Sequence, residues 1–169
     1  MKTLIPILFN IRSVYNVGAI LRSCDGFGIR EVYCAGWTPN PKKGLAHEQL
    51  NLTKRLHKTA LGAETKVKIK YAAELSAAIG ELRNRGFRIY ALEQDPESCN
   101  LVDLELGTDE KIALILGEER YGLGKEILAG CDKIVEIPML GSKESFNVSV
   151  AAAIAFYEMR RKDLSLLRD

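Results

Sequence analysis

The apolar residues of this chain occur in short runs and in helical repeats that alternate along its length. A short run that is apolar throughout, or that alternates apolar and polar residues, predicts a strand, and apolar residues three or four positions apart predict a helix. The expected strands cover residues 4–10, 30–36, 66–71, 87–93, 111–117 and 133–139. The expected helices cover residues 16–28, a lysine-rich and partly helical stretch ending near 64, 72–86, 122–131 and a closing segment from about 146 to 162.

Strands and helices that alternate in this way predict an α/β fold, with a parallel sheet and helices on both of its faces. The run IALIL (112–116) fits a strand buried on both sides, whereas KVKIKY (66–71) alternates like an edge strand. No internal repeat, low-complexity tract or linker interrupts the pattern, so we expect one domain over residues 1–169. Ligands of such sheets bind beyond the carboxyl ends of the strands. Three of these ends are rich in glycine and polar residues, namely 9–22, 116–124 and 137–149.

The composition fits a globular domain with a sizeable core. The chain has 169 residues and is 47% hydrophobic, and a domain of this size buries roughly two-thirds of the surface that its unfolded chain exposes. No apolar run reaches the ~18 residues that a membrane span requires. The opening MKTLIPILFNIRS is interrupted by polar residues and lacks a small-residue cleavage site. We therefore expect a soluble, cytoplasmic protein.

The thiols and imidazoles do not suggest a catalytic or metal site. The four cysteines are too scattered for a zinc site or a disulfide scaffold, so we expect buried or idle thiols at Cys24, Cys34, Cys99 and Cys131. His47 and His57 have no serine or cysteine placed to use them in a hydrolytic triad, and we expect them at polar helix or loop positions. We expect no metal.

The charge is unevenly distributed between the two halves of the chain. The net charge is +2, yet residues 1–88 carry 15 basic and 6 acidic side chains, while residues 89–169 carry 9 and 16. This asymmetry suggests a polyanionic partner for one face. Each basic block alone fits a solvated face, but their shared half also fits nucleic-acid binding. The blocks are PKKG (41–44), TKRLHK (53–58), KVKIK (66–70) and RNRGFR (83–88).

The glycines of GEERYGLGKE (117–126) do not form a known nucleotide-binding motif. The pattern GxxxxGK[ST] fails at Leu123, where a lysine is required, and Glu118 and Glu119 would repel a triphosphate. A GxGxxG fingerprint is also missing. Nucleotide hydrolysis and NAD binding therefore have little support.

Three segments taken together, in this order and at these spacings, closely resemble the three motifs of the SpoU/TrmH branch of the SPOUT RNA methyltransferases. Motif one corresponds to NVGAILRSCDGFG (16–28), motif two to LILGEERYGLG (114–124) and motif three to IPMLGSKESFNVSVAAAIAFYE (137–158). The intervening HKTALGAE (57–64) is also similar to that branch. The resemblance spans nearly the whole chain.

The resemblance implies a SPOUT fold, in which a parallel α/β sheet carries a C-terminal trefoil knot that forms a pocket for S-adenosylmethionine. It also implies a homodimer with active sites at or near the subunit interface. The implied activity is S-adenosylmethionine-dependent methylation of a ribose 2′-hydroxyl of tRNA or rRNA. We expect no added RNA-binding domain of the kind that larger members carry, and we expect the basic blocks at 42–70 and 83–88 to select the target, which favours tRNA over rRNA.

The resemblance assigns catalytic roles to five residues. Because an arginine stays protonated, we expect Arg22 to hold the RNA phosphate and to lower the pKa of the 2′-hydroxyl electrostatically. Glu119 is expected to anchor Arg22 or Asn16 by a charge-assisted hydrogen bond. Asn16 either orients the arginine or the ribose, or caps the helix that begins there. Ser145 is expected to cap the closing helix, and Asn147 to hold the ribose or neighbouring side chains.

The same resemblance places the cofactor. Gly117, Ile137 and Phe146 are expected to line the pocket together with Asn147, although Ile137 and Phe146 also fit an ordinary core. Two further residues, Met139 and Leu140, are expected in the bend beside it. Ser149 either faces the site or bonds back to a helical carbonyl.

Two other classes of function remain open at this stage. A non-catalytic knotted RNA-binding protein with a vestigial cofactor pocket would not bind S-adenosylmethionine. A small-molecule methyltransferase would bind the cofactor but have no affinity for RNA.

Overall fold

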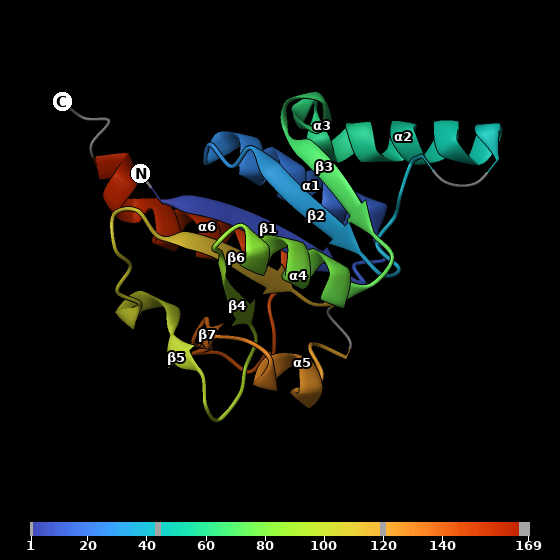
Figure 1. Ribbon diagram of the computed structural model, residues 1–169. Helices are drawn as coiled ribbons and strands as arrows, with labels where there is room; N and C mark the ends of the chain where they lie inside the picture. Colours follow the sequence, from blue (N-terminus) through green and yellow to red (C-terminus); the bar gives the residue numbers. More distant parts are fainter. Residues whose placement is uncertain (1, 43–44, 119–120, 166–169) are drawn as a thin grey trace.

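A parallel sheet of seven strands runs through the centre of the protein in this computed structural model, which describes residues 2–42, 45–118 and 121–165 (Figure 1). The order across the described sheet is β3-β2-β1-β6-β4-β7-β5, and every neighbouring pair is parallel. The predicted parallel α/β sheet is confirmed, as is the edge position of the strand in KVKIKY. The strands are β1 (Thr3–Phe9), β2 (Glu31–Ala35), β3 (Lys68–Ala72), β4 (Arg88–Leu92), β5 (Cys99–Asn100), β6 (Lys111–Leu116) and β7 (Lys133–Glu136).

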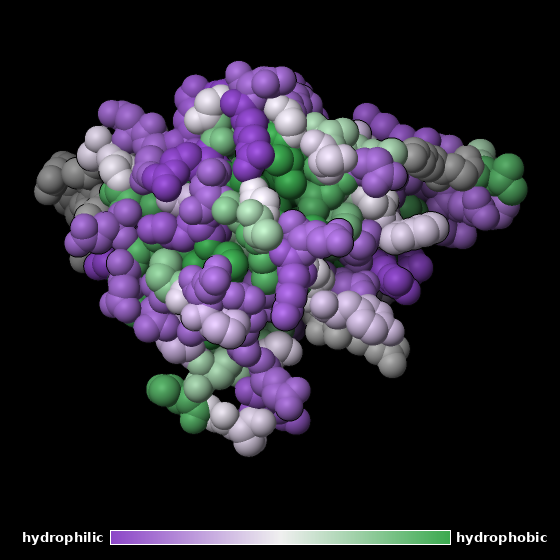
Figure 2. Space-filling model, turned by 60° about the horizontal axis from the view of Figure 1, so that its bottom comes forward, coloured by the Kyte–Doolittle hydropathy of each residue, from purple (hydrophilic) through white to green (hydrophobic). Residues whose placement is uncertain are grey.

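Helices cover both faces of the sheet, as the alternating pattern predicts (Figure 1). One face carries α1 (Val14–Gly26), α2 (Ala46–Ala60), α3 (Ala63–Lys66) and α6 (Val148–Ser165). The other face carries α4 (Leu75–Asn84) and α5 (Lys125–Ala129). None of the described helices is long and apolar enough to cross a membrane. Figure 2 shows hydrophilic side chains over much of the surface, with apolar areas interrupted by them.

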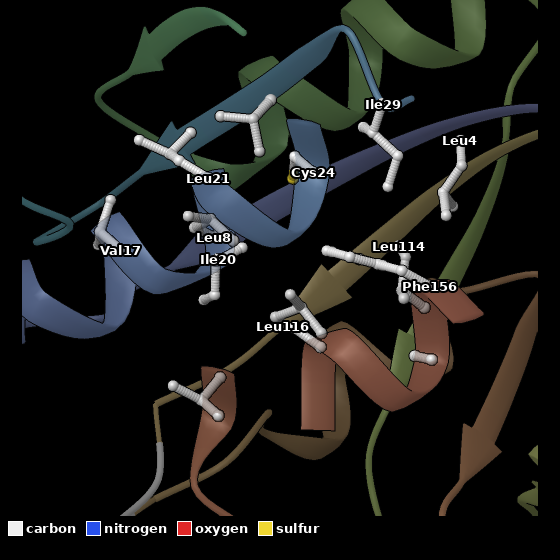
Figure 3. Packing of buried hydrophobic residues seen from close by; sticks show 14 of the residues in the cluster. Leu4, Leu8, Val17, Ile20, Leu21, Cys24, Ile29, Leu114, Leu116 and Phe156 are labelled. Atoms are coloured by element: carbon white, nitrogen blue, oxygen red, sulfur yellow. The ribbon is translucent and has the colours of Figure 1, made fainter. Parts of the chain in front are cut away.

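Two apolar clusters form the core, one on each face of the sheet. Successive side chains of a strand point to opposite faces, so a strand that is apolar throughout contributes to both clusters. Figure 3 shows the cluster beneath α1 and α6, where Leu8 of β1 and Leu114 and Leu116 of β6 lie close to Ile20 of α1 and Phe156 of α6. Each such side chain contributes roughly 1.5–3 kcal/mol when fully buried.

Helix α6 is attached to the beginning of β1 by a buried charged residue. Arg160 Nη1 donates to the backbone oxygen of Lys2 at 2.7 Å and to Asp163 Oδ2 at 3.2 Å. Lys2 Nζ in turn donates to the backbone oxygen of Met159 at 3.4 Å. Because an unpaired charge is costly to bury, these contacts allow Arg160 to lie inside the protein.

The cysteines are free, and the two in the middle of the fold are fully buried. Burial raises the pKa of Cys34 to about 12 and raises the pKa of Cys24 still further. A thiol with a raised pKa is a poor nucleophile. The expectation of buried or idle thiols is therefore confirmed for both residues.

The structure differs from the sequence-based expectation mainly at the ends of elements. Helix α1 begins at Val14 rather than at Asn16, and α6 begins at Val148 rather than at Phe146. Two short elements were not expected, namely β5 and the 3-10 helix Leu101–Asp103. They follow the acidic loop of residues 94–98 and are too short to give a periodic signal. The trefoil knot and the single domain over residues 1–169 stay predictions.

Candidate active site

A cavity of about 490 Å³ lies at the carboxyl ends of three neighbouring strands, β6, β4 and β7. Glu93 follows β4, Gly117 follows β6 and Ile137 follows β7 in the wall of the cavity. Phe146 and Val148, where α6 begins, complete the wall. The volume falls within the range of about 300–1,000 Å³ that is usual for small-molecule sites.

The residues expected at the cofactor site are divided between the cavity and its surroundings. Gly117, Ile137 and Phe146 line the cavity, and so does Ser145. Met139 and Leu140 lie on the bend that follows β7, outside the lining, and Leu140 is fully exposed. Their part in cofactor binding stays a prediction.

The lining carries a strong excess of negative charge. Among the described lining residues there are one lysine, Lys125, and five carboxylates, which belong to Glu93, Asp95, Glu118, Glu136 and Glu144. Such a wall favours a ligand with positive charge and disfavours a polyphosphate. Among the described residues, no group of three His, Cys, Asp or Glu side chains could hold a metal ion.

Glu93 connects two walls of the cavity. Its Oε2 accepts a hydrogen bond from the backbone N–H of Leu123 at 2.8 Å, and its Oε1 accepts one from the N–H of Gln94 at 3.0 Å. The carboxylate lies so close to Gly122, where φ is +60°, that a Cβ there would overlap it. A glycine is therefore required at this turn both for its conformation and for the approach of Glu93.

The loop after β4 also holds the segment that leads into α6. Gln94 Nε2 donates to the backbone oxygen of Glu144 at 2.9 Å. Glu93 is thus hydrogen-bonded to the segment that follows β6, and Gln94 is hydrogen-bonded to the segment that follows β7. The cavity is formed by segments that are held together by side-chain bonds.

Motif one and motif three meet at the edge of the cavity. Asn147 Nδ2 lies 3.3 Å from Asn16 Oδ1 and donates to it. Asn147 stands between Phe146 and Val148, which both line the cavity. Residues that are 131 positions apart in the chain therefore form one polar group beside the cavity.

Asn147 is also the N-cap of α6. Its Oδ1 accepts hydrogen bonds from the backbone N–H of Ser149 at 2.9 Å and from the Ser149 hydroxyl at 2.6 Å. A cap of this kind contributes about 1 kcal/mol, because it satisfies an amide that has no partner inside the helix. The same side chain thus uses its oxygen for the helix and its nitrogen for Asn16.

The expected cap at Ser145 was wrong, and one of the two alternatives left open for Asn16 and for Ser149 does not hold. Ser145 does not cap α6, because the helix begins three residues later and Asn147 occupies the capping position. Asn16 does not cap α1, because the helix begins at Val14 and Ser13 Oγ accepts from the Asn16 N–H at 3.4 Å. The hydroxyl of Ser149 bonds to the Asn147 side chain and not to a helical carbonyl.

Arg22 lies on α1, six residues beyond Asn16 and therefore about 9 Å farther along the helix axis. It is exposed and does not line the cavity. No described residue forms a hydrogen bond or ion pair with its guanidinium, which leaves the group available to an anion. Glu119, the expected anchor, lies outside the described residues. Its neighbour Glu118 lines the cavity and pairs with Arg12 at 3.3 Å.

Sequence reasoning missed the contribution of β4 to the cavity. Glu93, Gln94 and Asp95 all lie in its wall. One signal was present, because these residues directly follow the apolar run of 87–93 at a predicted carboxyl end. The sequence-based prediction of the binding site included only the three strand ends that are rich in glycine.

The fold and the cavity together define an α/β protein with a small-molecule site at the carboxyl edge of a parallel sheet. Residues 3–157 match the model of the SpoU rRNA methylase family. The chain belongs to this family.

Known relatives agree with this assignment. The tRNA (guanosine(18)-2′-O)-methyltransferase of Thermus thermophilus is 34% identical over 160 residues, which cover 94% of this chain and 74% of the relative. The enzyme of the same name from Escherichia coli K12 is 31% identical, over 90% of this chain and 60% of the relative. Among solved structures, a TrmH/SpoU tRNA modifying enzyme of A. aeolicus superposes with a TM-score of 0.79 at 30% identity, covering 98% of this chain and 77% of that chain.

Proposed function

We propose that this protein transfers the methyl group of S-adenosylmethionine to a ribose 2′-hydroxyl of RNA, with tRNA as the substrate. The observation that carries the proposal is the contact between Asn16 and Asn147 at the edge of a cavity lined by Gly117. These residues come from all three family motifs. The relatives from Thermus thermophilus and Escherichia coli, both named as tRNA ribose methyltransferases, support the choice of tRNA.

The cavity fits S-adenosylmethionine in size and in charge. When bound, this cofactor supplies an electrophilic methyl group on a positively charged sulfur. The carboxylates of the wall, such as Glu93 and Glu136, favour a bound cation. Gly117 lets a ligand approach the backbone closely, and Ile137 and Phe146 offer apolar surface to a flat ring.

The residues beside the cavity have to position the 2′-hydroxyl and favour the loss of its proton. Methyl transfer is an in-line displacement, so it depends on positioning: the carbon–sulfur bond breaks as the carbon–oxygen bond forms and the hydroxyl loses its proton. Asn16 and Asn147 hold each other at the point where the ribose would enter. Arg22, which stays protonated, attracts the adjacent phosphate and favours the anionic form of the hydroxyl.

A homodimer in the cytoplasm is part of the proposal. Helices α1 and α6 pack side by side on one face, and their outer surface includes apolar side chains of α6. Val150 is 47% exposed and Tyr157 is 53% exposed. A second copy covering this face would bury them and bring the exposed Arg22 near a site.

The direct test is a transfer assay with purified protein, methyl-labelled S-adenosylmethionine and bulk tRNA or rRNA. We expect label in tRNA, in a product that resists alkaline cleavage at the modified nucleotide, since a methylated 2′-oxygen cannot attack the phosphate. Calorimetry should show binding of S-adenosylmethionine in the absence of RNA. A protein that binds RNA but not the cofactor would be a non-catalytic RNA-binding protein, and one that binds the cofactor but not RNA would act on a small molecule.

Replacing Glu93 by alanine should weaken S-adenosylmethionine binding about tenfold. The change removes the carboxylate that holds the turn at Leu123, and a hydrogen bond to a charged group is worth about 1.5–3 kcal/mol. Titration calorimetry measures the effect. The control is Glu97→Ala, which removes an exposed carboxylate from the same loop outside the cavity lining. Equal cofactor affinity in the two variants would contradict this role of Glu93.

A further inference from the structure

Helix α2 leaves most of its surface in solvent. Among its fifteen residues only Leu56 and Ala60 are buried, and the helix extends beyond the edge of the sheet (Figure 1). Lys54 and Lys58 lie four residues apart and therefore share one side of the helix, next to Arg55. The exposed side chains of these three residues form a cationic surface, which we call the α2 surface.

The charges of the α2 surface are not neutralised within the protein. No described carboxylate lies within ion-pair distance of its three cations. The two nearest acidic residues in the sequence are engaged elsewhere, since Glu48 accepts from the N–H of Leu45 at 2.8 Å and Glu64 pairs with His57 Nδ1 at 2.5 Å. The α2 surface therefore presents an uncompensated positive field to a partner.

The basic block RNRGFR (83–88) is different. Arg85 pairs with Glu31 through two bonds of 3.0 and 3.1 Å, and Arg88 pairs with Glu110 at 3.1 Å. Burial by itself would raise the pKa of Glu31, but hydrogen bonds from Arg85 and Lys70 hold it below its ordinary value. Arg85 and Arg88 are thus paired with carboxylates, whereas the three cations of the α2 surface have no carboxylate partner among the described residues.

The α2 surface is attached directly to the catalytic end of α1. The guanidinium carbon of Arg55 lies 5.2 Å from the centre of the Tyr15 ring, and Thr59 Oγ1 donates to the backbone oxygen of Tyr15 at 3.0 Å. The helices approach so closely at Gly18 that a Cβ there would lie 2.7 Å from the backbone oxygen of Leu56. Tyr15 precedes Asn16 in the chain, and Arg22 lies two turns beyond Tyr15 on the same face of α1.

From this arrangement we infer that the α2 surface binds the phosphates of the substrate RNA next to the nucleotide that reaches the cavity. The inference rests on the proposed function. Phosphates fit three neighbouring cations that have no carboxylate partner among the described residues, and Arg55, oriented by the Tyr15 ring, connects them to the catalytic group. RNA would run from α2 across Tyr15 to Arg22 and Asn16.

The test compares two triple variants that each lose three positive charges. The first is Lys54→Ala/Arg55→Ala/Lys58→Ala, and the control is Arg83→Ala/Arg88→Ala/Lys111→Ala, which removes three exposed cations outside α2. Fluorescence anisotropy with bulk tRNA over a range of salt concentrations gives the affinity and its salt dependence. We expect the α2 variant to bind at least tenfold more weakly at low salt, with a slope of log K against log salt smaller by about 2, because each lost phosphate contact removes roughly 0.7–0.9. The tRNA affinity of the control variant should stay within threefold of that of the wild type.

Several results would overturn the inference. One is an equal loss in both triple variants, which would indicate a general effect of net charge. A second is an α2 variant that binds tRNA as tightly as the wild type, whether or not sedimentation shows a change in its oligomeric state. A third is a wild-type protein that binds no tRNA. Failure of the proposed function would give a different result from failure of this inference. The wild type would then bind tRNA without methylating it, and the α2 variant would still bind tRNA more weakly. Cofactor affinity, measured by calorimetry, should be unchanged in both variants.

A pair of single variants tests the connection between α2 and α1. Tyr15→Ala removes the ring that orients Arg55 and should weaken tRNA binding two- to fivefold. Tyr15→Phe keeps the ring and should bind tRNA as the wild type does. Equal affinities of the two variants would mean that the ring does not contribute to RNA binding through Arg55.

Discussion

Replacing Arg22 by alanine is expected to lower methyl transfer to tRNA at least 100-fold while leaving the affinity for S-adenosylmethionine within a few-fold of the wild type. Arg22 does not line the cavity, so its loss should not disturb cofactor binding. Its exposed guanidinium has no partner among the described residues, so its loss should not disturb the fold either. Removing a single group that stabilises charge at the reacting centre typically costs a factor of 10²–10³ in turnover.

The matched control for Arg22 is Arg30→Ala. Arg30 is an exposed arginine shortly after α1 whose only described carboxylate partner is Asp25, at 3.7 Å. Its removal should leave transfer within twofold of the wild type. Single-turnover transfer and titration calorimetry separate chemistry from binding. If Arg22→Ala loses cofactor binding while remaining folded, Arg22 belongs to the cofactor site and not to the activation of the hydroxyl.

Substitutions of Asn147 should separate the two functions of its side chain. Asn147→Ala removes the cap of α6 and the donor to Asn16, so turnover should fall about 100-fold and the protein should lose about 1 kcal/mol of stability. Asn147→Asp keeps an oxygen that can accept from the Ser149 N–H, so stability should stay near that of the wild type. It loses the amide donor, so turnover should remain low.

Thermal unfolding and transfer rates measured on the same preparations distinguish these effects. For a chain of this size, 1 kcal/mol corresponds to a shift of roughly 2–4 °C in the melting temperature. Asn84→Ala, at an exposed position at the end of α4, serves as the control. Wild-type turnover in Asn147→Asp would mean that the residue acts only as a helix cap.

Much of the sheet could be predicted because its strands are apolar throughout. The run at 112–116 is buried on both faces, so its composition alone indicated a central strand. The alternating run at 66–71 indicated an edge, and β3 lies there. The strand β5 gave no such signal, because two residues at the opposite edge are too few to show a period.

The position of β4 between β6 and β7 could not be read from the sequence. Strand order depends on how the connections cross the sheet, and the apolar pattern of a strand does not identify its neighbours. The sequence therefore did not show that residues 93–95 form a wall of the cavity. The contact of Asn16 with Asn147 was not predicted, and only the resemblance to a family assigned both residues to one site.

The helix cap and the basic blocks show how local patterns become ambiguous without tertiary contacts. Serine and asparagine are both good N-caps, and the prediction named Ser145 without considering Asn147 as a cap. The segment leading from β7 places Asn147 at the first turn, where it also reaches Asn16. The basic blocks TKRLHK (53–58) and RNRGFR (83–88) looked alike in sequence, and the pairing of Arg85 with Glu31 and of Arg88 with Glu110 distinguishes the second from the first.

The central place of β1 has a consequence for how the nascent chain folds. Its partner β2 follows soon after it, but its other partner is β6, and Thr3 pairs with Lys111. On the ribosome, one side of β1 therefore has no strand to bond with until more than half of the polypeptide has been synthesised. An open strand edge can pair with other molecules, so we expect translation products that end before β6 to be prone to aggregation.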